Sequence, residues 1–523
     1  MCGLVYVGDP SIEEEKIIKA YKRLEHRGPD DQQFLKNKNG YFAFTRLSIM
    51  DLTPSGDQPF QNDNLTTLCN GEIYNFRQLK EKYEYTYVSE SDCEVLLPIF
   101  RKEREKIVDI IDGEYAFVIY NQDDNSIFAA RDPMGIRPLF YGYTVNKKIC
   151  FASEAKALMH ICHDIKPFPP GYYFDKGEFV CFKDLSKVEK YSNDDFDTVV
   201  QNINKYLTEG IIKRLDSDAP LGFLLSGGLD SSLVCAVAQK HLKKPIKTFS
   251  IGMSGDAIDL KYAKEVADYI KSDHQEIIIT QEEALKSLED VIYHLETYDI
   301  TTIRASVGMF LICKAIREKT EVRALLTGEV SDEIFGYKYT DFAPSPEEFQ
   351  KEAAKRVKEL YMYDVLRADR CIAAHSLEAR VPFSDTAFVE YVMGIDPKMK
   401  MNSYGHGKYL LRKAFEDDCL PNSILYREKA AFSDAVGHSL VDGIKAYAEE
   451  KYTEQDVKDA AKKYNFKAPF TKESLLYREI FEKFYPGYAS WVVDYWMPNK
   501  EWENCDVSDP SARVLPNYGK SGE

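Results

Sequence analysis

Short apolar runs broken by Gly, Pro, Asn and Asp dominate the first 185 or so residues of the chain. Runs of this length predict strands, and the polar breaks between them predict turns. Two other segments, residues 11–27 and 91–104, repeat apolar side chains at helical spacing. The predicted strands have the sequences GLVYVG, YFAFTRLSIMD, TTLCNGEIYN, EYAFVIYN, SIFAARD and KKICFASE. Sheets flanked by a few helices are expected, which is an α+β domain.

A polar stretch at residues 183–197 contains few large apolar side chains and is predicted to link two domains. Beyond it, predicted strands and helices alternate along the chain, which indicates an α/β domain with a parallel sheet and helices on both faces. The last 180 or so residues have mostly helical patterns. The strands are expected at residues 219–225, 247–253, 274–280 and 322–328, and the helices at 231–242, 261–272 and 306–319.

Composition and charge narrow the class of protein. A chain of 523 residues is too long for one hydrophobic core, so two or three domains are expected. The formal net charge of -17 argues against a nucleic-acid partner or an anionic-membrane surface. We find no apolar run of about 20 residues that would span a membrane, and no signal peptide. Eleven cysteines without paired spacing indicate reduced thiols in a cytoplasmic protein.

The sequence LLSGGLDSSLVCA, residues 224–236, is the strongest motif in the chain. A predicted strand leads into a Ser/Gly turn and then a helix, which leaves backbone N–H groups free to bind phosphate. Asp230 is suited to bind a Mg²⁺ ion carried by that phosphate. The loop lacks the lysine of the G-x-x-x-x-G-K-[ST] motif and resembles the pyrophosphate loop of enzymes that split ATP into AMP and pyrophosphate. The alternative is a glycine-rich turn with a serine cap. The other residues of the loop are Ser226, Gly227, Gly228, Ser231 and Ser232.

A second acidic cluster, LLTGEVSDEIFG, lies about 100 residues further on. It also follows a predicted strand, so it is expected at the same carboxyl edge of the sheet, where ligands bind. Glu329, Asp332 and Glu333 are the candidate residues, and Asp332 is expected to share Mg²⁺ with Asp230. The alternative is a helix N-terminus enriched in acids because of the helix dipole.

The chain begins MCG, which raises the possibility of an N-terminal nucleophile. If Met1 is removed, Cys2 carries both a thiol and a free α-amino group. The α-amine has a pKa of roughly 7.7–8, which is close to the thiol pKa of about 8.5, so the amine can accept the thiol proton. It can later protonate a leaving amine. A cysteine that attacks the side-chain amide of glutamine would form a thioester and release ammonia.

Further residues in the first domain are suited to bind a free amino acid beside this thiol. Arg46 can hold an α-carboxylate through two N–H donors. Glu72 and Asp92 can hold an α-ammonium group, while Asn70 and the Gly71 N–H can form an oxyanion hole. Each has an alternative: Asn-Gly is a common hairpin turn, and a lone arginine on a strand is usually solvated.

Taken in order, these motifs resemble those of the glutamine-hydrolysing asparagine synthetases over roughly residues 2–500. The motifs are MCG, HRGPD, RLSI, NGEIYN, SDCEV, RDPMGIRPLF, SEAKAL, LLSGGLDSS, ETYDITTIRAS, SDE and EARVPF. The resemblance implies a glutaminase domain over residues 2–185, with the four-layer αββα sandwich of N-terminal-nucleophile hydrolases. It also implies an ATP-pyrophosphatase-type synthetase domain over residues 198–500, with a largely helical C-terminal part.

The resemblance also implies roles for individual residues. Cys2 would be the nucleophile, Glu329 would promote formation of β-aspartyl-AMP, and Lys429 would face the phosphates. Asp230 and Asp332 would bind Mg²⁺, while Arg304 and Arg380 are weaker candidates for aspartate or phosphate contacts. Glutamine would be bound by Arg46, Leu47, Ser48, Ile49, Met50, Asn70, Gly71, Glu72 and Asp92. ATP would be bound by Leu225, Ser226, Gly227, Gly228, Asp230, Ser231, Ser232, Ile251, Thr327 and Gly328.

Ammonia would travel between the two sites through an internal tunnel, and the substrates would be glutamine, aspartate and ATP. A cytoplasmic enzyme of amino-acid biosynthesis is implied, and a homodimer is common in the family. Two alternatives remain within this fold: a synthetase that acts on another carboxylate, and a regulatory glutamine-binding protein that has lost synthesis. A stand-alone N-terminal-nucleophile hydrolase is a further alternative, against which the long second domain argues.

The chain departs from the family pattern mainly in its second half. Val330 replaces a glycine, and a β-branched residue fits poorly wherever φ must be positive. The pattern F-G-G-Y is one residue short, and a His-Lys pair is absent from TDFAP, residues 340–344. FSD stands where FLD is usual, and in the first domain Glu90 replaces a smaller residue. The segment KAAFSDA, residues 429–435, has Ala430 in place of the expected acidic residue and Ala435 in place of the glycine, with Ala431 next to the first of these. Weakened synthesis or an altered acceptor is therefore expected.

Overall fold

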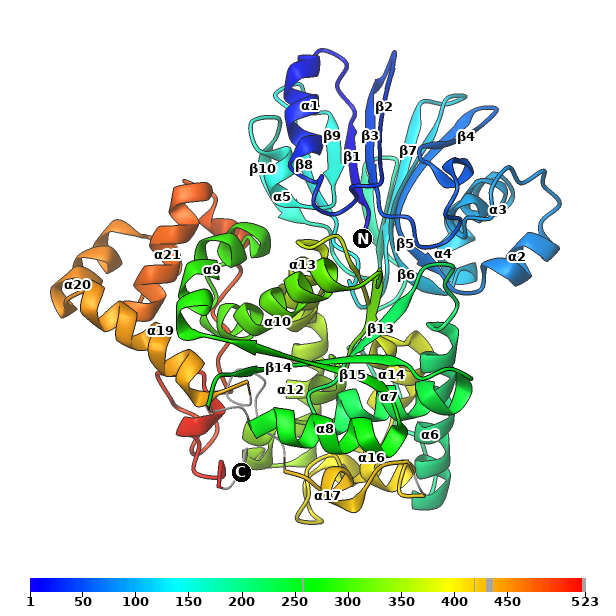
Figure 1. Ribbon diagram of the computed structural model, residues 1–523. Coiled ribbons are helices and arrows are strands. Elements are labelled where there is room, and N and C mark those ends of the chain that lie inside the picture. Colours follow the sequence, from blue (N-terminus) through cyan, green and yellow to red (C-terminus); the bar gives the residue numbers. More distant parts are fainter. Residues whose placement is uncertain (256–257, 418, 429–435, 520–523) are drawn as a thin grey trace.

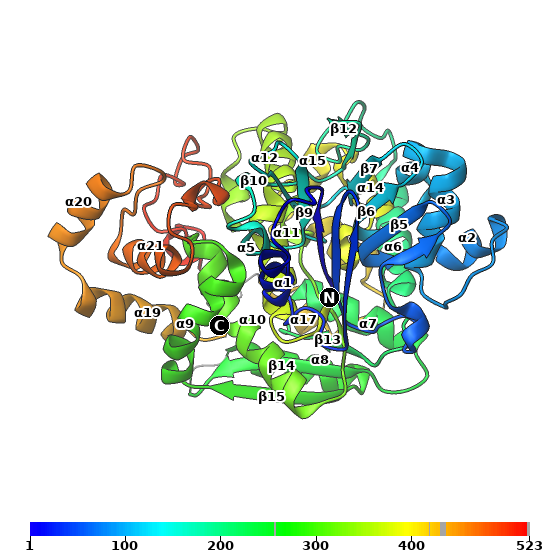
Figure 2. The ribbon, with the colours of Figure 1, turned by 90° about the horizontal axis from the view of Figure 1, so that it is seen from above.

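The computed structural model describes residues 1–255, 258–417, 419–428 and 436–519. The N-terminal domain lies above a domain built on a parallel sheet, and the N-terminus lies at the junction between them (Figure 1). Helices α19 (His438–Lys451), α20 (Glu454–Lys463) and α21 (Lys472–Phe484) flank the second domain on one side (Figure 2). In the described ranges, none of the helices has the length and apolar character needed to cross a membrane.

Twelve antiparallel strands form two sheets in the N-terminal domain. The first sheet contains β1 (Gly3–Val7), β2 (Asp31–Asn37), β3 (Gly40–Arg46), β8 (Phe140–Tyr143), β9 (Ile149–Ala152) and β10 (His163–Pro167), in the order β10-β8-β9-β1-β3-β2. The second contains β4 (Phe60–Asn62), β5 (Leu65–Ile73), β6 (Gly113–Asn121), β7 (Ser126–Arg131), β11 (Tyr172–Asp175) and β12 (Glu178–Cys181), in the order β12-β11-β7-β6-β5-β4.

The sheets pack face to face, with helices on both outer faces. Leu4 and Phe42 from the first sheet meet Leu68 and Val118 from the second in a dry core. Helices α1 (Glu14–Lys22) and α5 (Ala155–Leu158) cover the first sheet. Helices α2 (Phe76–Lys82), α3 (Leu96–Glu103) and α4 (Ile107–Ile110) pack beside the second. The domain therefore has the four-layer αββα architecture that the resemblance implies.

All six predicted strands of this domain are confirmed, as β1, β3, β5, β6, β7 and β9, and the two predicted helices are confirmed as α1 and α3. Six further strands escaped the sequence analysis. β2 is one of them: its residues are only partly buried and its sequence DQQFLKN is largely polar. β12 is another: it lies at the sheet edge, and three of its four residues are exposed. Edge strands bury too little apolar surface to leave a clear alternating pattern.

The second domain contains five parallel strands in the order β15-β14-β13-β16-β17. They are β13 (Leu221–Leu224), β14 (Lys247–Met253), β15 (Asp273–Ile279), β16 (Ala324–Leu326) and β17 (Glu378–Arg380). The first four were predicted, as were helices α7 (Leu229–His241), α8 (Ile258–Ile270) and α10 (Ile300–Lys319). β17 was missed because three residues carry no periodic signal.

The remaining helices surround this sheet, in agreement with the helical pattern of the last 180 residues. Helix α6 (Phe196–Lys213) begins at the end of the predicted linker. The others are α9 (Gln281–Leu295), α11 (Ser331–Phe335), α12 (Pro346–Glu359), α13 (Asp364–Ala373), α14 (Thr386–Met393), α15 (Pro397–Lys400), α16 (Tyr409–Ala414) and α17 (Asn422–Leu425).

A buried network of ion pairs joins the two domains. Arg27 of the first domain binds Glu154 at 2.7 Å and Asp369 of helix α13 at 2.9 and 3.0 Å. Arg370 of the same helix reaches back to Glu154 at 2.7 Å. Each of these arginines is fully buried, so the loss of one partner would leave a buried charge uncompensated. The network therefore fixes how the glutaminase-like domain sits on the parallel sheet.

Three histidine rings lie beside this network at the same interface. His26 contacts Glu154 at 3.2 Å, and its ring centroid lies 4.5 Å from that of His294 on helix α9. His375, which follows helix α13, packs against Phe310 at 4.3 Å between ring centroids. Burial lowers the pKa of His26 and of His294, and it lowers the pKa of His375 to about 4. The interface is therefore built to hold neutral imidazoles.

We expect acid to weaken this interface through His375. A histidine takes up its proton near pH 6.5 when unfolded but only near pH 4 in the folded chain, so the unfolded state binds more protons between these values. Stability from this residue is complete above pH 6.5 and falls by up to about 1.4 kcal/mol per pH unit as the pH drops toward 4. Thermal unfolding midpoints of the wild type and of His375→Gln, measured from pH 7 to pH 5, should converge as the pH falls.

Other groups also titrate over this range, so the test is the difference between the two proteins at each pH. His163→Gln supplies the matched control, because it removes an exposed imidazole by the same substitution. A wild type and a His375→Gln variant with parallel pH profiles would contradict the prediction.

Candidate active sites

The Cys2 thiol lies at the junction of the two domains, directly before strand β1 and against the loop that contains Leu47. Its Sγ is 3.5 Å from the Leu47 N–H and 3.6 Å from the Leu47 carbonyl oxygen. With Met1 attached, the Cys2 backbone N–H donates to Asn70 Oδ1 at 3.1 Å. Burial raises the pKa of the thiol to about 11, so formation of the thiolate requires a base. Removal of Met1 would turn the same nitrogen into an amine on the nucleophile itself.

Asn70 and Gly71 lie on β5 next to this thiol. The Asn70 side chain is buried, and its Nδ2 has no hydrogen-bond partner among the described residues. A buried donor without an acceptor is costly unless a ligand supplies one. A Cβ at Gly71 would lie 2.4 Å from the Glu114 carbonyl oxygen, so the close pairing of β5 with β6 requires glycine there. The Asn70 Nδ2 group is therefore suited to donate a hydrogen bond to an oxyanion.

Arg46 and Asp92, two further candidates for the glutamine site, are buried and have protein partners in this structure. Arg46 donates to the carbonyl oxygens of Thr53 at 2.7 Å and Asp51, and pairs with Asp57 at 2.6 Å. Asp92 accepts the Ile73 N–H at 2.7 Å, and burial raises its pKa to about 6. Arg46 therefore orders the loop over residues 50–57.

Glu72 and Arg380 form a contact between the two domains. Arg380 Nη2 lies 3.1 Å from Glu72, and its Nε donates to Glu378 at 3.0 Å. Its Nη1 donates to the carbonyl oxygens of Arg214 and Asp216 at 2.9 and 2.6 Å. The structure thus places Arg380, a candidate for aspartate or phosphate contacts, against the glutaminase-like domain and outside the large cavity described below.

The loop that contains Leu47, Ser48, Ile49 and Met50 connects the first site to the second domain. Leu47 and Ile49 pack against Ala219 and Ala324. Ala219 lies just before β13, and Ala324 is the first residue of β16. The Ala219 N–H donates to the Ile49 carbonyl oxygen at 3.1 Å. Ser48 lies at the loop surface, where its N–H donates to Asp30 at 2.9 Å. A shift of this loop would be transmitted directly to the parallel sheet.

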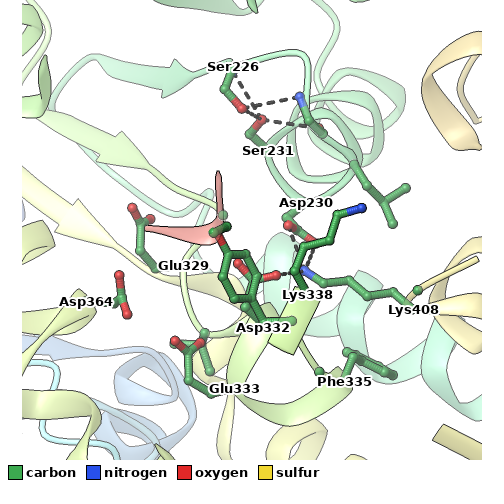
Figure 3. A pocket seen from close by; sticks show the side chains of 18 of the residues that line it. Ser226, Asp230, Ser231, Glu329, Asp332, Glu333, Phe335, Lys338, Asp364 and Lys408 are labelled. Atoms are coloured by element: carbon green, nitrogen blue, oxygen red, sulfur yellow. Dashed lines mark hydrogen bonds and ion pairs between the residues drawn. The ribbon is translucent and has the colours of Figure 1, made fainter. Parts of the chain in front are cut away.

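The second site lies at the carboxyl ends of β13, β14 and β16. The chain order reverses between β13 and β16, and such switch points open a crevice for ligands. A cavity of about 390 Å³ opens there (Figure 3). Among the predicted ATP-site residues that line it are Leu225, Ser226, Gly228, Asp230, Ser231, Ile251, Thr327 and Gly328.

The SGGLDSS loop forms a tight turn at the start of helix α7. The Ser226 N–H donates to Ser231 Oγ at 3.2 Å, and the two hydroxyl groups are 3.0 Å apart. Gly227 has a φ of +72°, and a Cβ there would lie 2.5 Å from the Ala263 nitrogen of helix α8. The Oγ of Ser232 and Oγ1 of Thr327 are buried without a partner in the described part of the chain. Of these two residues, Thr327 lines the cavity, so its hydroxyl group can bind a ligand there.

Asp230 and Asp332, the predicted metal ligands, are brought together although they lie 102 positions apart in the sequence. Their carboxylates converge on the Lys408 ammonium, at 2.8 Å from Asp230 and 2.6 Å from Asp332 (Figure 3). Ser331 Oγ donates to Asp230 at 2.7 Å. Two carboxylates around one point, next to a phosphate loop, suit the all-oxygen coordination of Mg²⁺ with phosphate. Asp230 and Asp332 are therefore chemically suited to bind Mg²⁺, and in this structure the Lys408 ammonium lies between them.

Glu329 stands at the wall of the cavity next to a further group of charges. Arg367 of helix α13 lies 3.3 Å from Glu329 and 2.8 Å from Asp364. Glu333 lies close to Asp364 and Asp332, and burial together with these carboxylates raises its pKa. The cavity end thus has several acids and one shared arginine, which is suited to bind a substrate that carries both an ammonium group and carboxylates.

The two other synthetase candidates have different outcomes. Arg304 lines the cavity, but its guanidinium is paired with Glu473 at 2.6 Å and with Asp509 at 2.8 Å. Lys429 lies outside the described residues, as do Ala430, Ala431 and Ala435.

Several cavity residues escaped the sequence analysis, among them Lys408, Asp364 and Arg367. The glycines at 405 and 407 mark a turn before Lys408, but nothing local indicates that its side chain reaches Asp230. Asp364 and Arg367 belong to an ordinary amphipathic helix. Only the tertiary fold brings these residues to the strand ends.

Val330, which stands where the family pattern has glycine, has a positive φ. Its φ is +84° and its ψ is -25°, just before helix α11, and its side chain is 1% exposed. A β-branched residue in this region costs on the order of 1–3 kcal/mol of backbone strain. Val330 lies between Glu329 and Asp332, so this strain acts on the loop that carries both acids.

We expect Val330→Gly to raise the turnover of the second site, by about fivefold if about 1 kcal/mol of strain is relieved in the transition state. Glycine adopts positive φ freely, whereas Val330→Ala retains a smaller penalty and should give an intermediate rate. Steady-state pyrophosphate release by the three proteins measures this. Equal kcat and KM in all three would contradict a strained loop.

Comparisons with known proteins agree with the two-site geometry. Residues 1–170 match the family model described as a glutamine amidotransferase domain, and residues 202–347 and 341–508 match the one described as asparagine synthase. The chain is 40% identical to an asparagine synthetase (glutamine-hydrolyzing) of Mus musculus, over 99% of both chains. Proteins of the same name from Homo sapiens and Zea mays are 39% and 38% identical, with 99% and 94% of those proteins covered. A solved structure described as the allosteric regulatory enzyme of purine biosynthesis aligns with 54% of this chain and 80% of its own, at a TM-score of 0.31 and 13% identity.

Proposed function

This chain belongs to the family of glutamine-hydrolysing asparagine synthetases, and from that premise we propose which of its residues carry the two half-reactions. The enzyme makes asparagine from aspartate and ATP with ammonia released from glutamine, and it yields AMP, pyrophosphate and glutamate. The observation that carries the assignment of sites is their pairing on one chain. A buried thiol with an available oxyanion donor lies in one domain, and a cavity at a phosphate loop lies in the other.

In the glutaminase half, Cys2 attacks the carbonyl carbon of the glutamine side chain after removal of Met1. The α-amine of Cys2 takes the thiol proton and gives it to the departing ammonia, and water then hydrolyses the thioester to glutamate. Asn70 Nδ2 and the Gly71 N–H stabilise the oxyanion. The α-carboxylate and α-ammonium groups of glutamine are bound by the loop of Arg46 and by Glu72 and Asp92, which requires rearrangement of their present contacts.

In the synthetase half, the SGGLDSS loop holds the phosphates of ATP and the ends of β13, β14 and β16 hold the nucleoside. The β-carboxylate of aspartate attacks the α-phosphorus, pyrophosphate leaves, and ammonia then displaces AMP from β-aspartyl-AMP. Glu329, positioned by Arg367 at 3.3 Å, promotes formation of this intermediate. Mg²⁺ bound by Asp230 and Asp332 would neutralise charge on the phosphates.

Several finer assignments belong to the same proposal. The glutaminase and synthetase domains span residues 2–185 and 198–500, and Lys429 faces the phosphates. Ammonia crosses the interface beside Cys2, through the space that the fully buried Met1 fills before its removal. We also propose that the enzyme works in the cytoplasm and forms a homodimer.

Aspartate-dependent release of pyrophosphate from ATP, with ammonium as the nitrogen source, tests the synthetase assignment without involving Cys2. We expect release that requires aspartate and is not supported by glutamate at the same concentration. The departures at Val330 and in residues 429–435 lie in this half, so the assay addresses the part of the chain that differs most from the family pattern. Release without aspartate, or no release at all, would contradict the assignment.

A further inference from the structure

One lysine occupies the point where the two acids of the synthetase site converge. The Lys408 ammonium donates to both carboxylate oxygens of Asp230 at 2.8 Å and to Ser331 Oγ at 3.0 Å. It also lies 2.6 Å from Asp332 (Figure 3). All its polar contacts in this cluster are thus with groups of the two ATP-site loops. Lys408 is 6% exposed and Asp230 equally so, which places the pair out of bulk water.

The chain holds Lys408 at this point through a specific turn. Lys408 is the residue before helix α16 and has a φ of +59°, while Gly405 has a φ of +78°. Arg412 of the helix anchors the turn, since its Nε donates to the Gly407 carbonyl oxygen at 2.7 Å. Leu410 and Leu411 are buried and fix the helix itself. The lysine side chain therefore extends from a well-anchored backbone toward the two acids.

We propose that Lys408 is an exchangeable internal cation that keeps free divalent metal ions out of the Asp230–Asp332 pair until a nucleotide is present. The proposal rests on the function proposed above, in which these two aspartates bind the metal. It makes Lys408 a positioning residue of the synthetase site, because it acts through the two aspartates.

The physical argument is one of charge and space. A divalent cation cannot bind both carboxylates while an ammonium lies between them at 2.6–2.8 Å. Displacement of the ammonium without a replacement partner would strand a buried positive charge, which is costly. The triphosphate of ATP supplies such a partner, because its oxygens can accept the ammonium while the metal takes the carboxylates. Metal and nucleotide should therefore bind together, and the acids stay neutralised before ATP arrives.

A lysine with a purely structural role predicts something different. Its removal would loosen the site and weaken metal binding in every state. The exchange proposal instead predicts a gain: a neutral side chain at position 408 removes this ammonium from between two adjacent carboxylates, which should then attract a divalent ion more strongly even without nucleotide. A damaged fold would not produce a gain of affinity that depends on Asp230.

The test is a titration of the full-length protein with Mn²⁺, followed by the electron paramagnetic resonance signal of the free ion. Without nucleotide, we expect Lys408→Met to bind Mn²⁺ at least tenfold more tightly than the wild type, and Lys408→Arg to resemble the wild type. Lys338→Met is the matched control: Lys338 lines the same cavity but pairs with Glu428 at 2.8 Å, so its loss should give no gain. Asp230→Asn added to Lys408→Met should abolish the gain.

Two results would overturn the proposal. One is a Lys408→Met protein whose nucleotide-free Mn²⁺ affinity equals or falls below that of the wild type. The other needs no Lys408 variant, and so holds even if that variant does not fold: tight nucleotide-free binding by the wild type at a site that Asp230→Asn removes. Mn²⁺ binding with a non-hydrolysable ATP analogue separates the two levels of the argument. If Asp230→Asn and Asp332→Asn leave that binding unchanged, the metal-ligand assignment itself fails, whereas if they weaken it, only the exchange role is in question.

Discussion

Replacement of Cys2 by alanine should abolish glutamine-dependent asparagine formation, with a loss of about 10³-fold or more, and leave ammonium-dependent formation intact. The Cys2 thiol is the proposed nucleophile, and removal of a nucleophile costs at least this much in comparable acyl-transfer enzymes. Alanine still permits removal of Met1, so the α-amine and its contact with Asn70 Oδ1 are retained. Glutamate and asparagine should be quantified in the same reactions, with glutamine or ammonium as the nitrogen source.

Cys181→Ala is the matched control, because Cys181 is exposed on the edge strand β12, far from the Cys2 loop. It should keep both activities. The mass of the mature protein should show that Met1 has been removed, since an attached Met1 leaves the Cys2 nitrogen in a peptide bond. A Cys2→Ala protein that still forms glutamate from glutamine would contradict the role of the thiol, and loss of ammonium-dependent synthesis would point to damage at the domain interface.

The parts of the fold that sequence patterns predict are those whose cause is local. The strand, turn and helix of LLSGGLDSS follow from a short apolar run, two glycines and a helix start, and the structure has them as β13, a turn at Gly227 and helix α7. The positive φ at Val330 was also predictable, because a position that favours glycine reveals its backbone conformation. Periodicity and turn residues depend on neighbours in the sequence, so they can be recognised without the fold.

Contacts between distant segments leave no such local signal. Arg380 shows this: its sequence context EARVPF suggests a substrate contact, yet the guanidinium pairs with Glu72 across the domain interface. Lys408 shows the reverse, because an unremarkable lysine after a glycine turn lies between the two acids of the synthetase site. In both cases the partner is more than 70 residues away, and the pairing depends on how whole domains and helices pack.

Replacement of Asp230 by asparagine should stop aspartate-dependent pyrophosphate release with either nitrogen source, by about 10²–10³-fold, the scale expected when one charge-stabilising group is lost. Asparagine keeps the shape of the side chain but removes its charge, which is needed to hold a metal on the phosphates. The same substitution removes one of the two carboxylates that contact Lys408, so the ammonium should draw closer to Asp332 and compete with any metal there. Glutamine hydrolysis should persist, since Cys2 and Asn70 lie in the other domain.

Asp268→Asn is a matched control on the second domain, because Asp268 is exposed on helix α8 and forms an ion pair with Lys264, one helical turn away. It should release pyrophosphate at the wild-type rate. The two variants should have opposite defects. Cys2→Ala should lose glutaminase activity and keep ammonium-dependent synthesis, whereas Asp230→Asn should keep glutaminase activity and lose synthesis. An Asp230→Asn protein with a normal rate of pyrophosphate release would show that the charge of Asp230 is dispensable. The convergence of Asp230 and Asp332 on one cation would then be a structural ion pair and not part of the ATP site.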